Sequence, residues 1–248
     1  MLSLPLAPAQ SGIFFRQQLD LRDPRFNLAQ LTEIIGPLDV EALHAALRRT
    51  VGEAQAMQVR IVVTDGMPHQ VLPDEMEDFA LRVVDVSDAP DPVEAIDREV
   101  QAALASAIDL DRYPLFDGQL FQAGPTRFFL FQRIHHIAFD GFSFFLFTQR
   151  LAAVYSALVE GREPAPCAWG QLTELIDDDN AYRASSAFEI DQQILGASAH
   201  VEHALSLHSC CEIGNHAPAQ ARFAHDHFVD ASIDQGRVDA LTCRLNFR

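Results

Sequence analysis

The sequence predicts an α/β fold, an α+β sandwich, in which strands and helices alternate along the chain. Two observations carry this prediction. Runs rich in β-branched and aromatic residues, at 59–63 and 126–134, are typical of strands, whereas 40–51 and 93–108 repeat apolar residues every three or four positions, as amphipathic helices do. Because the two kinds of segment are interleaved, we expect helices packed on a mixed sheet.

The first half of the chain provides several start and stop signals. A helix is expected over 9–19 and a strand over 26–35, which ends at Gly36-Pro37. Asp39 is a suitable N-cap for the helix that follows. The Asp65-Gly66 pair predicts a hairpin between 59–63 and 69–72, and a further strand is expected over 81–84.

The second half continues the alternation. Asp91-Pro92 places an N-cap before a proline at the first helical position, and the helix is expected to use apolar residues as far as Ile108. Segments 120–122 and 126–134 are expected to pair around Gly124-Pro125. A last clear helix begins near Phe142 and stops at Gly161.

The remaining residues have weaker patterns. Glu163-Pro164-Ala165-Pro166 resembles a domain boundary, and 174–191 is acidic with helical character. After Gly196 the chain is rich in Ala, His and Ser, with segments 227–229 and 238–241 expected to open a strand and a helix. These shifts divide the chain into a unit over 1–165, an acidic helical connector over 166–200 and an incomplete, poorly ordered unit over 201–248.

Composition narrows the classes of function. A hydrophobic content of 48% is sufficient for a sizeable core. The formal net charge of −17 argues against binding to nucleic acid or to anionic membranes, because both would repel the chain. No apolar run reaches the roughly 18 residues of a membrane span, the densest being 142–146. No signal peptide is evident, and the 4 cysteines lack a disulfide framework, so we expect a cytoplasmic protein with reduced thiols.

The most informative segment is His135-His136-Ile137-Ala138-Phe139-Asp140-Gly141, at the junction of the expected strand and helix. Strand alternation sends the two imidazoles to opposite faces, so that one packs inward and the other faces a cleft. An imidazole can take up and return a proton near neutral pH. The junction is therefore the candidate active site.

These residues resemble the HHxxxDG motif of condensation domains from nonribosomal peptide synthetases. Segment 4–15, Leu-Pro-Leu-Ala-Pro-Ala-Gln-Ser-Gly-Ile-Phe-Phe, is similar to the opening motif of that family, and 136–144 resembles most the subgroup found in enterobactin-type siderophore synthetases. The similarity covers roughly residues 1–195. It implies a chloramphenicol acetyltransferase-like fold with one complete lobe and the start of a second, the later motifs of the family being absent.

The resemblance also implies a reaction. Condensation domains join an acyl group, held as a thioester on a donor carrier domain, to the amine of an aminoacyl group on an acceptor carrier domain. The phosphopantetheine arms belong to the carriers, which are expected with adenylation modules in cis, so no cofactor is expected to be bound here. No phosphate-binding loop or ATP chemistry is expected either.

The family pattern assigns roles to the motif. His136 becomes the catalytic residue, either as base or as orienter of the amine. Asp140 is expected to be structural, holding the loop through backbone amides or an arginine, and Gly141 to supply backbone freedom or close approach to substrate. His135 and Ser143 are candidate substrate contacts, although packing suits His135 better and helix capping suits Ser143 equally well. In the opening motif, Gln10 and Ser11 are expected to start a helix near the cleft, and Phe14 and Phe15 to enter the core.

Other functions are compatible with the same residues. A CoA-dependent acyltransferase shares the fold and an HxxxD core, and a truncated, inactive remnant would at most bind a carrier protein. Histidines and cysteines are also concentrated between His200 and His227, but their spacing matches no recognised zinc set, and we expect no metal.

Overall fold

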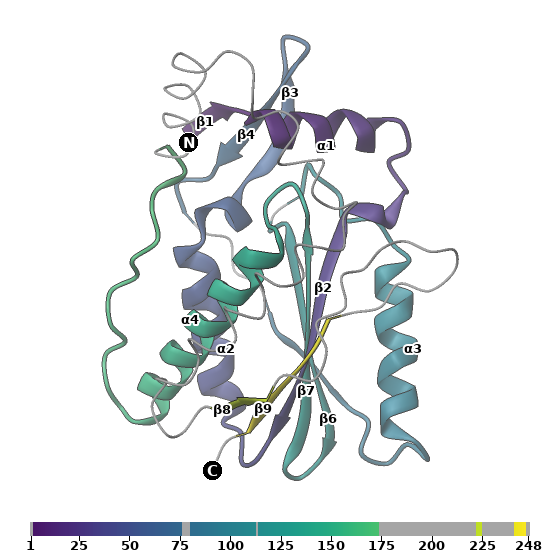
Figure 1. Cartoon of the computed structure of the whole chain (residues 1–248), viewed down its shortest axis with the longest axis vertical. Helices are drawn as coiled ribbons and strands as arrows, with labels where there is room; N and C mark the ends of the chain where they lie inside the picture. Colours follow the sequence, from purple (N-terminus) through teal and green to yellow (C-terminus); the bar gives the residue numbers. More distant parts are fainter. Residues whose placement is uncertain (1, 76–79, 113, 174–221, 225–240, 247–248) are drawn as a thin grey trace, which may run out of the picture.

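The fold is seen in a computed structural model, which describes residues 2–75, 80–112, 114–173, 222–224 and 241–246 (Figure 1). The helical elements are α1 (Pro8–Gln18), η1 (Pro24–Phe26), α2 (Val40–Glu53), η2 (Gln55–Gln58), α3 (Pro92–Leu104) and α4 (Gly141–Val159). The strands are β1 (Leu2–Pro5), β2 (Asn27–Ile35), β3 (Arg60–Thr64), β4 (Met67–Leu72), β5 (Arg82–Asp85), β6 (Phe116–Gly124), β7 (Arg127–His135), β8 (Arg222–Ala224) and β9 (Leu241–Asn246). The predicted alternation of strands and helices is confirmed.

Two sheets organise these elements. The larger has the order β5-β6-β7-β2-β9-β8, with β7 antiparallel to both β6 and β2. The smaller has the order β1-β4-β3 and lies at the end of the molecule that carries α1 (Figure 1). Helices α2 and α4 cover one face of the larger sheet and α3 covers the other. The result is a three-layer arrangement with α1 and the small sheet at one end.

The core follows from alternation along β2, β6 and β7. One set of buried residues, including Ile34, Leu130 and Ile134, packs beneath α2 and α4. The opposite set, including Phe121, Phe129 and Phe131, packs against α3. Both faces of the central strands are therefore apolar, and burial of this surface is the main source of stability, at roughly 25 cal/mol per Å² of apolar area.

Local sequence signals set most of the boundaries. Asp39 and Asp91 cap α2 and α3 by accepting bonds from backbone amides of the first helical turn. The β3–β4 turn places Asp65 and Gly66 at φ 53° and 78°, as the expected tight hairpin requires. Gly161 follows α4 with φ 66°, where a residue without a Cβ is favoured.

Helix α3 differs from expectation, because it ends at Leu104 and not near Ile108. The amide of Asn27 donates to the carbonyls of Leu104 and Ser106, at 3.1 and 2.7 Å. The guanidinium of Arg133 also donates to carbonyls at this end of the helix. These side chains, from β2 and β7, satisfy carbonyls that a longer helix would have used itself.

Two further expectations need correction, and others are not covered by the described residues. Phe15 is 55% exposed and does not enter the core, whereas Phe14 is buried. Leu241 begins a strand and not a helix. The expected helix over 174–191 and the expected strand over 227–229 lie outside the described residues. The division at 165 and 200 stays a prediction, although β9 pairs with β2 in the sheet of the first unit.

Helix α4 also corrects the expectation about membrane spans. Among the described helices it is long and apolar enough to cross a membrane by length and composition. A buried core helix has the same composition. The side chains of Phe144, Phe147, Leu151 and Val154 are buried in the core beneath α4, so packing within the protein accounts for its apolar character.

An ion network joins α4 to α2. Arg150 donates to both carboxylate oxygens of Glu53 at 2.7 Å, and Arg49 donates to the same carboxylate at 3.2 Å. The hydrogen bond from Arg150 is the main reason that the pKa of Glu53 lies below its ordinary value. The two side chains of the Arg150–Glu53 pair are only 11% and 18% exposed, so solvent screens the pair weakly.

We expect Arg150→Met to lower the free energy of unfolding by about 2 kcal/mol, because it leaves the Glu53 carboxylate partly buried without its main donor. Urea denaturation at neutral pH measures this loss. Arg162→Met is the matched control, since Arg162 pairs with Glu160 at an exposed site, and its effect should stay below about 0.5 kcal/mol. Equal effects of the two substitutions would show that the Arg150 pair contributes no more than a surface pair.

Candidate active site

The two histidines lie at the end of β7, and the strand turns their side chains in opposite directions. His135 pairs with Asn27 in the ladder with β2, and its side chain is buried, with 1% exposed. His136 follows the strand and is exposed, while its backbone amide donates to the carbonyl of Phe26 at 2.8 Å. The backbone of His136 is thus fixed by the sheet while its imidazole is accessible.

The His135 ring is held by two polar contacts. Its Nδ1 accepts a hydrogen bond from the backbone amide of Ile137 at 3.1 Å, and its Nε2 lies 3.4 Å from the amide oxygen of Gln17. An Nδ1 that accepts must be unprotonated, so the Nε2 proton points at Gln17. Burial, and secondarily the neighbouring His136, lower the pKa of His135 to about 4. His135 is therefore neutral near pH 7.

This geometry corrects the assignment of His135 as a substrate contact. The ring is enclosed and both nitrogens are occupied within the protein, so it has no free polar atom to offer a ligand. The role of the buried His135 ring is structural, because its hydrogen bond to the backbone amide of Ile137 fixes the residue that follows His136. The structure matches the expectation that one imidazole packs inward, and this imidazole is that of His135.

The opening segment of the chain holds the same loop from the other side. Gln10, on α1, donates to the carbonyl of Ile137 at 3.1 Å, and its side-chain oxygen accepts the backbone amide of Ala7 at 2.9 Å. Gln70, fully buried on β4, contacts the Gln10 side chain at 3.2 Å and donates to the carbonyl of Pro5. Helix α1 thus reaches the motif through the side-chain amide of Gln10.

Gln17 and Gln70 were not anticipated from the sequence. One signal was available for Gln17, which lies seven positions after Gln10 and hence on the same face of α1. No comparable signal existed for Gln70, whose role depends on the pairing of β4 with β1.

Asp140 caps helix α4. One carboxylate oxygen accepts the backbone amide of Ser143 at 2.7 Å and the Ser143 hydroxyl at 2.6 Å. The amide contact is the backbone bond expected for a structural carboxylate. Arg133, an alternative partner, pairs instead with Asp117 at 3.2 Å. The hydroxyl of Ser143 donates inside the protein, so a substrate contact at Ser143 would have to use its lone pairs.

Gly141 is the first residue of α4, and it lacks the positive φ that would demand glycine. The expectation of unusual backbone freedom at Gly141 is therefore wrong. A Cβ built at this position meets no atom within 4 Å, so the space beside it is open. Close approach of a substrate stays a prediction for this position.

We expect Asp140→Ala to lower the free energy of unfolding by about 1 kcal/mol, because it removes the cap of α4. Asp140→Asn keeps an oxygen acceptor and should cost only a few tenths of that amount. Thermal unfolding of both variants beside the parent protein measures the difference. If the two variants are equally destabilised, the negative charge and not the hydrogen bond is what matters.

The arrangement permits proton transfer or hydrogen bonding by His136 at the surface of the described part of the chain. His136 lines neither the small cavity beneath α4 nor the groove beside α1. Within the described ranges, no group of three His, Cys, Asp or Glu side chains is placed to hold a metal ion. The histidine- and cysteine-rich segment between His200 and His227 lies outside those ranges.

The fold has clear counterparts among solved structures. A variant of the starter condensation domain of rhizomide synthetase RzmA, in complex with C8-CoA, is 32% identical, with a TM-score of 0.70 over 73% of this chain and 42% of that one. The first condensation domain of the calcium-dependent antibiotic synthetase, in complex with a substrate analogue, is 34% identical, with a TM-score of 0.70 over 75% and 44%. The fold and the motif define a chloramphenicol acetyltransferase-like lobe, as predicted.

Sequence comparison agrees with the structural comparison. The family model described as "Condensation domain" matches residues 3–193. The dimodular nonribosomal peptide synthase of Bacillus subtilis is 42% identical over 77% of this chain, and enterobactin synthase component F of Escherichia coli O157:H7 is 28% identical over 76%. The chain belongs to the condensation-domain family of nonribosomal peptide synthetases, and the recognition made from the motif is confirmed.

The matches cover only part of the length of each relative. The chain spans 8% and 15% of the length of these two synthetases and less than half of the two solved chains described above. Condensation domains form amide bonds and work with phosphopantetheine held by carrier proteins. For this chain, amide formation and carrier partners are proposals.

Proposed function

We propose that this chain contributes the His136 side of a condensation site. That site joins a carrier-bound acyl thioester to a carrier-bound aminoacyl amine. The observation that carries the proposal is the difference in environment between the two histidines. His135 is neutral and locked in the fold, and His136 is exposed on a backbone fixed by the sheet.

The chemistry required of His136 is modest. The α-ammonium of the acceptor must lose a proton before its nitrogen attacks the thioester carbonyl, and the thiolate that leaves must be protonated. An imidazole can perform both transfers, or it can orient the amine while solvent takes the proton. Asp140 supports this site by capping α4, and Gly141 leaves space beside it.

The partners follow from the same proposal. Donor and acceptor carrier domains bring the two substrates on phosphopantetheine arms, and adenylation modules in cis would load those carriers. No cofactor resident on this chain, nucleic acid or membrane takes part, and a cytoplasmic location suits an enzyme supplied by such carriers. The similarity to enterobactin synthase component F, at 28% identity, favours siderophore biosynthesis as the setting.

A direct assay tests the proposal. A polypeptide that contains this chain together with the rest of a condensation domain is mixed with an acyl-loaded donor carrier and an aminoacyl-loaded acceptor carrier. Transfer of the acyl group to the acceptor carrier is followed by intact-protein mass spectrometry. The proposal requires a mass increase on the acceptor equal to the acyl group, with loss from the donor. No transfer with any pair of loaded carriers would exclude it.

A second candidate function is acyl transfer from coenzyme A. The observation that favours it is the solved relative in complex with C8-CoA. The same assay separates the two, because acyl-CoA replaces the donor carrier in one arm. Faster transfer from the free acyl-CoA than from the loaded carrier would favour the CoA-dependent acyltransferase.

The 248-residue chain by itself is expected to form little or no amide, since His136 lines neither described cavity. The same mass assay on the purified chain measures this. A pull-down with a loaded carrier then distinguishes a chain that binds carriers without catalysis from one that does neither. Robust amide formation by the isolated chain would contradict the expectation.

A further inference from the structure

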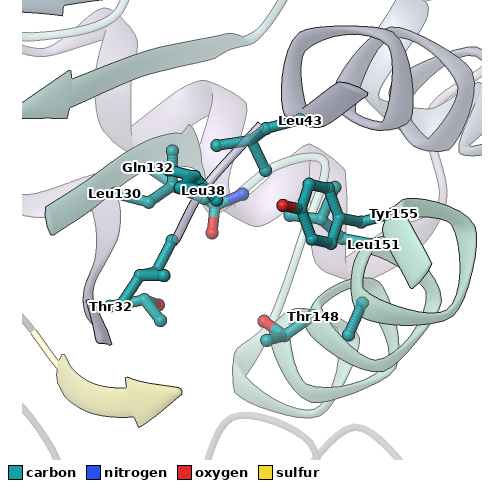
Figure 2. Close-up of a pocket in the computed structure, with 10 residues that line it drawn as sticks. Thr32, Leu38, Leu43, Leu130, Gln132, Thr148, Leu151 and Tyr155 are labelled. Carbon is teal, nitrogen blue, oxygen red and sulfur yellow. The ribbon is translucent and has the colours of Figure 1, made fainter. Parts of the chain in front are cut away.

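A small cavity lies between helix α4 and the larger sheet. Residues from β2, β7, α2 and α4 line it, and its volume is about 20 Å³ (Figure 2). Most of the lining is apolar, with Leu43, Leu130 and Leu151 among it. Four polar side chains interrupt this lining, namely Thr32, Gln132, Thr148 and Tyr155, and the Tyr155 hydroxyl already accepts the backbone amide of Asp39 at 3.0 Å.

Gln132 is the unusual member of this set. Its side chain is completely buried, and neither the nitrogen nor the oxygen of its amide has a hydrogen-bond partner among the described residues. Figure 2 shows the amide pointing from the sheet into the space toward α4. Leaving a buried amide donor and acceptor unpaired is unfavourable, so buried amides are nearly always paired.

The neighbours of Gln132 explain why the protein itself does not satisfy this amide. On one side its cross-strand partner is Gly118, which has no side chain. On the other side its partner is Gln30, whose amide contacts Thr32 at 3.4 Å and Thr148 at 3.2 Å. The Thr148 hydroxyl has a single proton, which is shared between the Gln30 side-chain oxygen and the carbonyl of Phe144 at 2.9 Å, so it has none left for the Gln132 oxygen.

We propose that the cavity beneath α4 is a binding site for one ordered water molecule, held by the Gln132 amide and the hydroxyls of Thr32 and Thr148. A volume of about 20 Å³ exceeds the roughly 10–15 Å³ that a single water needs by the same measure, and it is too small for an organic ligand. A water can accept from the Gln132 nitrogen and donate its two protons to neighbouring oxygens. It therefore supplies an acceptor for the Gln132 nitrogen and a donor for the Gln132 oxygen.

The position of the site gives this water a structural role. Gln132 lies on β7 three residues before His135, and Thr148 lies on α4 eight residues after Asp140. Strand and helix are the two arms that hold the HHxxxDG loop, and they meet across this cavity. The water joins β7 to α4 through hydrogen bonds, next to the direct bond from Thr148 to Gln30 of β2. This inference is independent of the proposed reaction.

Solution NMR on the deuterated, ¹⁵N-labelled 248-residue chain tests the site directly. We expect the side-chain amide protons of Gln132 to show cross-peaks at the water frequency, with NOE and ROE of opposite sign, which is the signature of a water that tumbles with the protein. A cross-peak whose intensity grows with pH arises from exchange of the amide protons with solvent, and it does not count as evidence for a bound water. An absent cross-peak means a dry cavity and overturns the proposal.

Substitution by methionine, which has a similar volume, gives a second readout. If a water already pairs with the Gln132 amide, Gln132→Met loses those bonds and the urea midpoint of unfolding falls. If the amide is dry, the same substitution removes an unpaired polar group, and the midpoint rises. Gln58→Met is the matched control, because Gln58 is a buried glutamine that donates to the carbonyls of Val51 and Gly52. A rise for Gln132→Met beside a fall for Gln58→Met would overturn the proposal.

Discussion

His136→Ala is expected to reduce amide formation by a complete condensation domain carrying this chain by about 10²–10⁴-fold, the usual contribution of general acid–base help. The fold should be unaffected, because the His136 ring is exposed and its bond to the described residues, to the carbonyl of Phe26, is made by the backbone amide, which alanine keeps. The rate is measured with loaded carriers under single-turnover conditions, and circular dichroism checks the fold. His69→Ala is the control, since His69 lies on β4 in the small sheet.

A second substitution at the same position separates the two roles left open for His136. Glutamine can keep a hydrogen bond to the amine but cannot take its proton. If His136 is the base, His136→Gln should be as slow as His136→Ala. If it only orients the amine, His136→Gln should recover a substantial part of the rate. Normal turnover in both variants would remove His136 from the mechanism.

Stability is expected to fall as the pH is lowered, because His135 is buried in its neutral form. The pKa of this group is about 4 in the folded protein and about 6.5 when unfolded. Between these values the unfolded chain binds more protons than the folded one, so acid favours unfolding. The contribution of His135 is fully present above pH 6.5 and is lost toward pH 4. A difference of about 2.5 pKa units corresponds to about 3 kcal/mol.

The measurement compares urea unfolding at several pH values between 7 and 4.5 for the parent protein and for His135→Asn. The asparagine side-chain oxygen is placed to accept the Ile137 amide as Nδ1 does, and it does not titrate in this range. Carboxylates such as Glu53 titrate equally in both proteins, so the difference between the two curves isolates His135. Parallel curves would show that His135 has an ordinary pKa in the folded protein.

The fold was largely predictable from the sequence, because it depends on local signals. Asp39 and Asp91 cap helices where an acidic residue precedes an apolar repeat, and Asp65-Gly66 makes the turn that its composition demands. The opposite exposure of His135 and His136 follows from the two-residue period of a strand. In each case the deciding interaction is within a few residues along the chain.

The missed features depend instead on contacts between distant segments. Helix α3 ends at Leu104 because Asn27 and Arg133, from two other elements, reach its last carbonyls. Gln70 joins the motif only because β4 pairs with β1. Such contacts require the strand order, which periodicity does not supply, so the contacts of Asn27, Arg133 and Gln70 could not be foreseen.

The strand order also has a consequence for the order of events during synthesis. β2 occupies an inner position of the large sheet, and its neighbour on one side is β9, whose residues come more than 200 positions later in the sequence. While a ribosome makes the intervening residues, that side of β2 has unpaired backbone amides and carbonyls. The hairpin of β6 and β7 can already have docked on the other side. The nascent chain therefore carries an open sheet edge until residues 241–246 have emerged, and it must avoid pairing with other chains throughout that interval.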